Sequence, residues 1–304
     1  MAKNVFGDKW SFTSFGESHG AAIGGVLDGV PAGLHIDFDM IREELERRAG
    51  RGVVGTSARA KKEPDEVEWL SGVMDGVTLG TPIAFIIRNK DARPEDYAYL
   101  KHTYRVGHAD RVYEQKYGIR DWRGGGRASA RETASRVVAG CLAKQELAQK
   151  GIAIQAQLVQ VGAETDPNKF AEVIAAYQKE GDSIGGIVEC HITGLPAGVG
   201  EPIFNKLQAE LAFAIMSINA CKGFEYGTGF GGVTQPGSAI NAISGGIAGG
   251  ISDGTEVVFR CVFKPTPSTP KAGVKGRHDA CVATRAVPVV EAMTALALIN
   301  LYAA

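Results

Sequence analysis

An internal repeat is the feature that most restricts how this chain can fold. Residues 23–34 read IGGVLDGVPAGL, and residues 184–199 read IGGIVECHITGLPAGV. Each copy has a short apolar run, a Gly-x-Pro-Ala-Gly turn and then a segment with apolar residues at helical spacing, at 38–49 and at 203–214. Chance explains a matching turn more easily than it explains the shared IGG and the shared helix. We therefore expect a duplicated α+β unit.

Further segments extend this pattern to the whole chain. Strands are predicted for three runs rich in Ile, Val or Phe, at 82–87, 152–161 and 256–263. Asp166 and Pro167 predict the start of a helix that runs to Lys179, and a second helix is predicted from Arg285 to Leu301. No linker separates the two halves, at about 1–150 and 151–304. We expect a single domain over 1–304, an internally duplicated β-α-β sandwich with helices packed between or against mainly antiparallel sheets.

Charge and composition exclude several classes of protein. The net charge of −1 argues against binding of nucleic acid by the whole surface. No apolar run approaches the roughly 20 residues needed to span a bilayer, and MAKNVFGDKW has no apolar signal core. The 5 cysteines are odd in number and lack CxxC spacing, which predicts neither a disulfide framework nor a zinc site. We expect a cytoplasmic protein with no metal and no membrane or nucleic-acid partner.

Glycine is unusually frequent, with 40 residues, and it clusters at 124–126, 231–232, 245–246 and 249–250. Glycine is needed where φ is positive or where the backbone closely approaches another group. These clusters indicate either tight turns alone or backbone wrapped around a ligand.

Positive charge is concentrated between residues 105 and 136, which hold seven arginines and Lys116 against four acidic residues. At the centre is GGGRASARETASR (124–136), in which Ser129 and Glu132 have the spacing of a capping box and predict a helix start at Ser129. A helix N-terminus that follows glycines and is flanked by Arg127 and Arg131 is suited to phosphate. The alternative is an ordinary capped helix with solvated arginines.

Nucleotide and nucleophile motifs give no assignment. The sequence contains no GxxxxGK[ST]. The pattern GxSxG occurs at 16–20, 181–185 and 250–254, but we do not interpret any of these as a nucleophile elbow. The single GxGxxG match, at 227–232, follows no clear strand and opens no helix, so it does not indicate a Rossmann site.

Three histidines are candidates for catalysis, although a lone histidine is usually structural. His19 lies in the polar turn Gly-Glu-Ser-His-Gly, His108 lies inside the arginine-rich segment and His278 precedes Asp279. His108 is favoured because it lies beside the predicted phosphate site. The others, His35, His102 and His191, have no such setting and are interpreted as structural.

Two further features allow two interpretations each. Asp279, flanked by Arg277 and His278, is either an ion-paired scaffold or a base whose pKa its neighbours tune. The segment Lys264–Ser268 (KPTPS) either presents polar groups to an anion from a proline-stiffened backbone or is a plain loop.

Six segments of the chain resemble the chorismate synthase family. They run in the family's order and span nearly the whole chain, at 16–31, 107–140, 181–185, 216–227, 249–254 and 276–293. The resemblance implies a 1,4-anti elimination of phosphate from 5-enolpyruvylshikimate-3-phosphate, which gives chorismate in the shikimate pathway of aromatic amino acid biosynthesis. It also implies reduced FMN as cofactor, NADPH as a possible indirect reductant, an external source of reduced flavin and a homotetramer.

The resemblance also implies roles for individual residues. His19 would be the acid toward the leaving phosphate, His108 would govern protonation of the reduced flavin, and Asp279 would help flavin N5 act as a base. Substrate contacts would come from Ser18, Arg48 and Arg131, with Arg51 or Arg59 as a further arginine. The positions that match flavin contacts of the family are Arg127, Ala128, Ser129, Asn219, Ala220, Gly249, Lys264, Pro265, Thr266, Pro267, Ser268 and Arg277.

The chain also departs from the family pattern. It is shorter than expected, with abbreviated stretches before Gly181 and between Lys264 and Arg277, and Ala280 stands where the family commonly has proline. Three functions follow as hypotheses: an FMN-dependent phosphate lyase, a weakened paralogue that binds FMN or anions without turnover, and a flavin or nicotinamide oxidoreductase. The intact set His19, His108, Asp279 and Arg127 favours the lyase.

Overall fold

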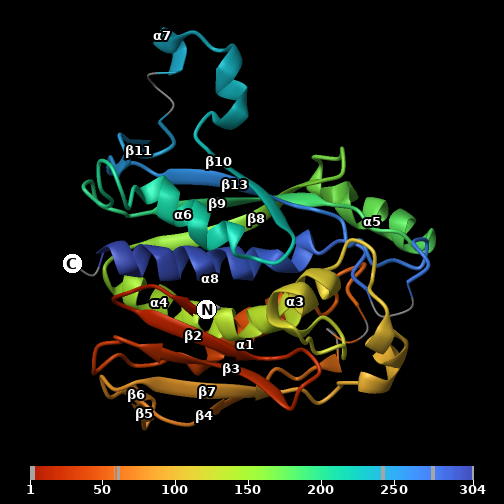
Figure 1. Cartoon of the computed structure of the whole chain (residues 1–304). Coiled ribbons are helices and arrows are strands. Elements are labelled where there is room, and N and C mark those ends of the chain that lie inside the picture. The colour runs from red at the N-terminus through yellow and green to blue at the C-terminus, as the bar shows by residue number, and fades with distance from the viewer. Residues whose placement is uncertain (1–3, 58, 60–61, 241–243, 275–277, 303–304) are drawn as a thin grey trace.

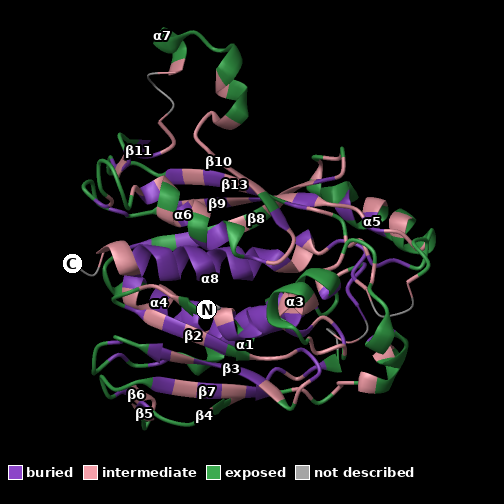
Figure 2. Ribbon diagram, in the orientation of Figure 1, coloured by how far each residue is buried: buried purple, intermediate pink, exposed green. Residues whose placement is uncertain are grey.

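The computed structural model describes residues 4–57, 59, 62–240, 244–274 and 278–302. Two antiparallel sheets form the outer layers of a sandwich, and helices fill the space between them (Figure 1). The α+β sandwich predicted from the sequence is therefore confirmed. Figure 2 shows buried residues concentrated on the central helices and along the strands that face them.

The first sheet has the order β1-β2-β3-β7-β4, and the second has the order β10-β13-β9-β8. The strands of the first are β1 (Val5–Phe6), β2 (Ser11–Gly16), β3 (Ala22–Asp28), β7 (Ile83–Arg88) and β4 (Val67–Trp69). Those of the second are β10 (Cys221–Tyr226), β13 (Val257–Phe263), β9 (Gly186–Thr193) and β8 (Ala153–Val161). Two small hairpins pair β5 (Val73–Met74) with β6 (Val77–Thr78) and β11 (Ile247–Ala248) with β12 (Ile251–Ser252).

Four helices lie between the sheets: α1 (Phe38–Ala49), α4 (Thr133–Gln149), α6 (Leu207–Met216) and α8 (Ala283–Tyr302). Outside this layer are α3 (Asp110–Tyr117), α5 (Phe170–Lys179) and α7 (Gly237–Ile240), the last on an arm that projects from the body (Figure 1). Turns of 3₁₀ helix occur at Pro94–His102, Gly126–Ala128, Ala130–Glu132, Pro167–Lys169 and Gly229–Thr234.

The two copies of the sequence repeat have matching local structure. In each, a strand leads through the Gly-x-Pro-Ala-Gly turn to a helix, β3 to α1 and β9 to α6. α1 occupies the predicted range, with Asp37 accepting a hydrogen bond from the backbone N of Met40 at 2.9 Å. α6 begins later than predicted because Asn205, with φ of 59°, cannot belong to a right-handed helix.

α8 is the core of the sandwich, and it confirms the helix predicted from Arg285 to Leu301, with two more residues at its start and one at its end. Among the described residues it is the one helix long and apolar enough to cross a membrane by length and composition, and 78% of its apolar window is buried inside the protein. A helix that is apolar on all sides suits a position between two sheets. Near its end, Asn300 accepts hydrogen bonds from the backbone N of Asp8 and of Lys9, both at 2.9 Å, which ties the last helix to the first loop.

The contact between α4 and α8 depends on a glycine. A Cβ added to Gly140 would lie 2.3 Å from the Cβ of Ala292 and 2.4 Å from its Cα. Helix propensity alone favours alanine over glycine by about 1 kcal/mol. We expect the clash to outweigh this preference for alanine, so that Gly140→Ala lowers the free energy of unfolding by about 1–3 kcal/mol in a denaturant titration.

The matched control for this prediction is Gly237→Ala. A Cβ at Gly237 would meet no atom within 4 Å, so the unfolding midpoint should stay close to that of the wild type. A Gly140→Ala protein as stable as the wild type would contradict the close packing of α4 on α8.

Candidate active site

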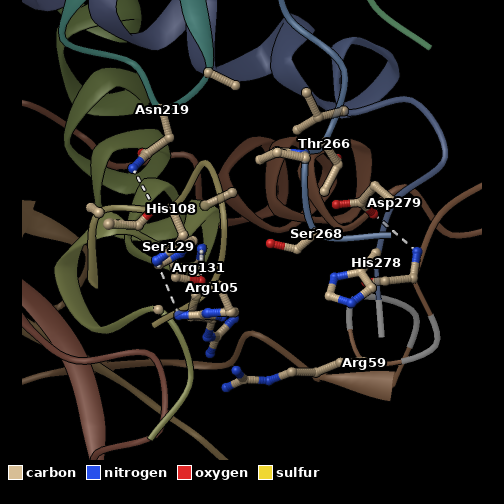
Figure 3. Close-up of a pocket in the computed structure, with 18 of the residues that line it drawn as sticks. Arg59, Arg105, His108, Ser129, Arg131, Asn219, Thr266, Ser268, His278 and Asp279 are labelled. Atoms are coloured by element: carbon tan, nitrogen blue, oxygen red, sulfur yellow. Dashed lines mark hydrogen bonds between the residues drawn. The ribbon is translucent and has the colours of Figure 1, made fainter. Parts of the chain in front are cut away.

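Loops from both halves of the chain meet at one end of the sandwich and enclose a cavity of about 400 Å³, within the usual size of ligand pockets. The cavity is lined by residues 19, 48, 57, 59, 63, 97, 105, 107–109, 125, 128–131, 219–220, 264–268, 278–279, 282 and 285. It brings together the three residues predicted to be catalytic, His19, His108 and Asp279. Figure 3 shows Asn219, Ser129, His108, Arg105 and Arg131 on one side, Thr266, Ser268, His278 and Asp279 opposite, and Arg59 below them.

The walls of this cavity are predominantly cationic. Six of its side chains are arginine or lysine, namely Arg48, Arg59, Arg105, Arg131, Lys264 and Arg285, whereas Glu63 and Asp279 are acidic. Burial lowers the pKa of Arg48 to about 9, with Asp65 opposing the effect, so this guanidinium is still charged at neutral pH. Such a lining favours a ligand with several negative charges.

His19 is held by neighbours from two loops. Its Nδ1 lies 3.1 Å from Ser18 Oγ, and Nη1 of Arg59 lies 3.4 Å from both ring nitrogens. The ring of Tyr97 packs edge-on at 4.7 Å between centroids. Gly124 explains part of the triple glycine, since its φ is +70° and a Cβ there would lie 2.2 Å from His19 Nδ1. The glycine thus allows the backbone to pass directly against the histidine ring.

His108 is oriented by an ion-paired carboxylate. Its Nδ1 lies 2.8 Å from Oδ1 of Asp110, and Arg105 binds both oxygens of the same carboxylate, at 2.8 and 2.9 Å. Although burial acts in the opposite direction, the hydrogen bonds from Arg105 and His108 hold the pKa of Asp110 far below its usual range. A permanently charged Asp110 favours the tautomer with a proton on Nδ1, which leaves Nε2 as the nitrogen that can exchange a proton.

Asp279 combines the two interpretations that the sequence left open, since it lines the cavity and is also ion-paired. Its Oδ2 accepts hydrogen bonds from Arg285 Nη2 at 2.5 Å and Nε at 3.1 Å, and its Oδ1 accepts one from the backbone N of Ser57 at 3.0 Å. Arg285 is the first charged residue of α8, so the core helix itself positions this carboxylate.

Three buried polar atoms that line the cavity have no hydrogen-bond partner among the described residues: Asn219 Oδ1, Ser268 Oγ and His278 Nε2. Burial, with a smaller contribution from Arg105, lowers the pKa of His278, so its ring is neutral at neutral pH. Buried polar atoms are almost always paired, which indicates that a polar ligand completes these three.

Several residues singled out from the sequence lie elsewhere. Arg51 is directed to the backbone oxygen of Glu63, at 2.7 Å, and it is Arg59 that lines the cavity. Ser18 lies behind His19 and is not part of the lining. Gly249 lies in the turn between β11 and β12, away from the cavity, and Arg277 lies outside the described residues.

Arg127 and the helix after it also differ from expectation. The Arg127 guanidinium turns toward β2, donating to Ser14 Oγ at 2.7 Å and Gly16 O at 3.2 Å, and it borders a neighbouring cavity instead. Ser129 caps only a 3₁₀ turn, by accepting from the backbone N of Arg131 at 3.3 Å, and α4 begins at Thr133. The predicted anion site at a helix start is therefore replaced by a cavity lined by arginine side chains.

Sequence reasoning assigned no role to Glu63, Tyr97, Arg105 or Arg285, which all line the cavity. Arg105 could have been found, because it belongs to the arginine-rich segment. The other three reach the cavity through long-range packing, for which the sequence carries no local signal.

Comparisons with a family model, with known relatives and with a solved structure all point to the same family. A family model described as chorismate synthase matches residues 10–303. The chorismate synthase of Phocaeicola vulgatus is 47% identical over 353 residues, covering 98% of this chain and 97% of the relative, and that of Christiangramia forsetii is 46% identical over 351 residues, covering 99% and 98%. A crystal structure of chorismate synthase superposes with a TM-score of 0.77 at 30% identity, covering 97% of this chain and 92% of the other.

The chain belongs to the chorismate synthase family. It is accordingly an enzyme of the phosphate lyase class. Its alignments with these chorismate synthases extend over more residues than the 304 of this chain, so it has internal deletions relative to them. The cavity nevertheless retains His19, His108 and Asp279.

Proposed function

We propose that this chorismate synthase family member catalyses the 1,4-anti elimination of phosphate from 5-enolpyruvylshikimate-3-phosphate, with reduced FMN bound. The observation that carries the proposal is the convergence of His19, His108 and Asp279 on one cationic cavity. The substrate bears one phosphate and two carboxylates, and FMN bears another phosphate. A cavity with six cationic and two acidic side chains fits such a set of ligands.

The residues present also fit a flavin. Asn219, Ser268 and His278 supply the three unpaired polar atoms, which can bond the oxygen and nitrogen atoms at the edge of a flavin ring. They lie on both sides of the cavity (Figure 3), as expected for groups that clamp a ring. When bound, reduced flavin supplies an electron and accepts a hydrogen at N5.

His19 is assigned the acid role toward the leaving phosphate. Its contacts with Ser18 and Arg59 limit rotation of the ring, and the Arg59 guanidinium is placed to attract the same phosphate. Proton donation from His19 would neutralise charge that develops as the C–O bond breaks.

His108 and Asp279 are assigned proton-handling roles toward the cofactor. Asp110 holds His108 through Nδ1, so that a proton is exchanged at Nε2. Arg285 and the backbone of Ser57 fix Asp279 at the wall of the cavity, where its carboxylate can accept a hydrogen bond from a bound ring N–H.

The assembly and setting of the enzyme are part of the same proposal. We place it in the cytoplasm, as a homotetramer supplied by an external flavin reductant, with NADPH as the indirect source of electrons. A weakened paralogue that binds FMN or anions without turnover is the second candidate, because the chain lacks residues that its relatives have.

An anaerobic assay with photoreduced FMN tests the proposal. We expect the protein to release phosphate and form chorismate in equal amounts from 5-enolpyruvylshikimate-3-phosphate, and to release none with oxidised FMN. Binding of FMN and substrate without phosphate release would instead identify the weakened paralogue. If NADPH and a flavin reductant replace photoreduction, consumption of NADPH in proportion to product would identify an oxidoreductase, because the elimination has no net redox change.

A further inference from the structure

Behind the arginines of the cavity lies a carboxylate that does not line it. Asp65 has a side chain only 2% exposed, in the segment between α1 and β4. Its Oδ2 accepts a hydrogen bond from Arg48 Nη1 at 3.2 Å, and its Oδ1 forms a short ion pair with Nη1 of Arg131. Asp65 therefore joins two arginines that come from distant parts of the sequence and that both line the cavity.

The other contacts of these arginines are neutral. Arg48 also donates to Ala130 O at 2.7 Å and to Thr133 Oγ1 at 3.2 Å. Arg131 also donates to Asn89 Oδ1 at 2.9 Å. The side chains of Arg48 and Arg131 are each about 95% buried or more. Two positive charges repel strongly in such an environment, and the carboxylate that they share offsets this repulsion and fixes both guanidinium groups.

Asp65 holds this position at a conformational cost. Its φ is 52°, in the left-handed region that few residues other than glycine adopt. Asparagine and aspartate tolerate this region best, so the backbone suits a short side chain with an oxygen. Nearby, Oε1 of Glu63 accepts hydrogen bonds from Arg59 and from no other cavity arginine among the described residues. Glu63 and Asp65 therefore bind different arginines.

We propose that Asp65 is a positioning residue that holds Arg48 and Arg131 at the spacing required by two anionic groups of the substrate. The inference rests on the proposed function, because it assumes that these two arginines bind the substrate. It assigns Asp65 no contact with substrate or cofactor.

The test compares Asp65→Asn with Glu66→Gln. Asparagine keeps the shape and tolerates the backbone, whereas Glu66 is a neighbouring surface carboxylate, 69% exposed and paired with Lys90. We expect Asp65→Asn to lower kcat/KM for 5-enolpyruvylshikimate-3-phosphate by about 100-fold, as for a misplaced substrate anchor, and Glu66→Gln to leave it unchanged. Rates are to be expressed per folded protein, from thermal unfolding of each variant.

Inorganic phosphate provides a second readout, measured by isothermal titration. Because Asp65→Asn keeps both positive charges, we expect the affinity for free phosphate to stay equal to that of the wild type or to rise. A purely structural role would leave kcat/KM per folded protein unchanged, and that result would overturn the proposal. A parallel loss of phosphate and substrate affinity would overturn it as well, because it would indicate a collapsed site.

Asp65→Glu keeps the test decisive if the asparagine variant does not fold. The charge remains but shifts by one methylene, so we expect kcat/KM to fall about tenfold with phosphate affinity retained. Unchanged kcat/KM in this variant would contradict positioning by Asp65. If the wild type itself shows no phosphate release, the proposed function fails, whereas failure of the Asp65 inference requires an active wild type.

Discussion

His19→Ala is expected to lower kcat for phosphate release by about 10²–10⁴-fold, the usual range for loss of a general acid. The reason is that a ring fixed by Ser18, Arg59 and Tyr97 is replaced by a methyl group that cannot donate a proton. Single-turnover phosphate release with photoreduced FMN measures the effect without interference from flavin reduction.

Substrate binding should persist in this variant, because Arg48, Arg59 and Arg131 are unchanged. His102→Ala is the matched control, since His102 is an exposed residue at the end of a 3₁₀ turn, and it should have wild-type activity. Wild-type activity of His19→Ala would remove this histidine from the mechanism.

His108→Ala is expected to lower kcat by a similar factor, about 10²–10⁴-fold. Here the cause is impaired proton transfer to the bound cofactor, not to the leaving phosphate. The variant loses the group that Asp110 and Arg105 orient and leaves their ion pair in place. We therefore expect FMN affinity, measured by quenching of flavin fluorescence, to change far less than the rate of phosphate release.

The control for His108 is His191→Ala on β9, where the ring pairs with Glu189 and Glu256 on the outer sheet. Full turnover in His108→Ala under photoreduced conditions would show that proton transfer to the cofactor does not depend on this residue.

Much of the fold was predictable because short local patterns in the sequence mark its strands, turns and helices. The repeated Gly-x-Pro-Ala-Gly turn marks the passage from strand to helix in both halves, and α1 occupies its predicted range. The start of α6 was missed because a single residue, Asn205, takes a left-handed conformation that the apolar spacing of the segment does not reveal.

The site was predictable only in part. His19, His108 and Asp279 lie in short distinctive motifs, and all three line the cavity. The direction of Arg127 was not predictable, because it depends on acceptors in β2 more than 100 residues earlier. Asp65 and Arg285 escaped notice for the same reason, since each acquires its role through partners brought near by the tertiary fold.

The place of α8 in the sandwich has a consequence for refolding. This helix follows every strand of both sheets in the chain, yet it packs between them and carries Asn300, which fastens the loop at residues 8 and 9. Such contacts join residues far apart in the sequence, and they form slowly because a long loop must close first. Docking of α8 also brings Arg285 to Asp279, so the position of this carboxylate depends on closure of the sandwich.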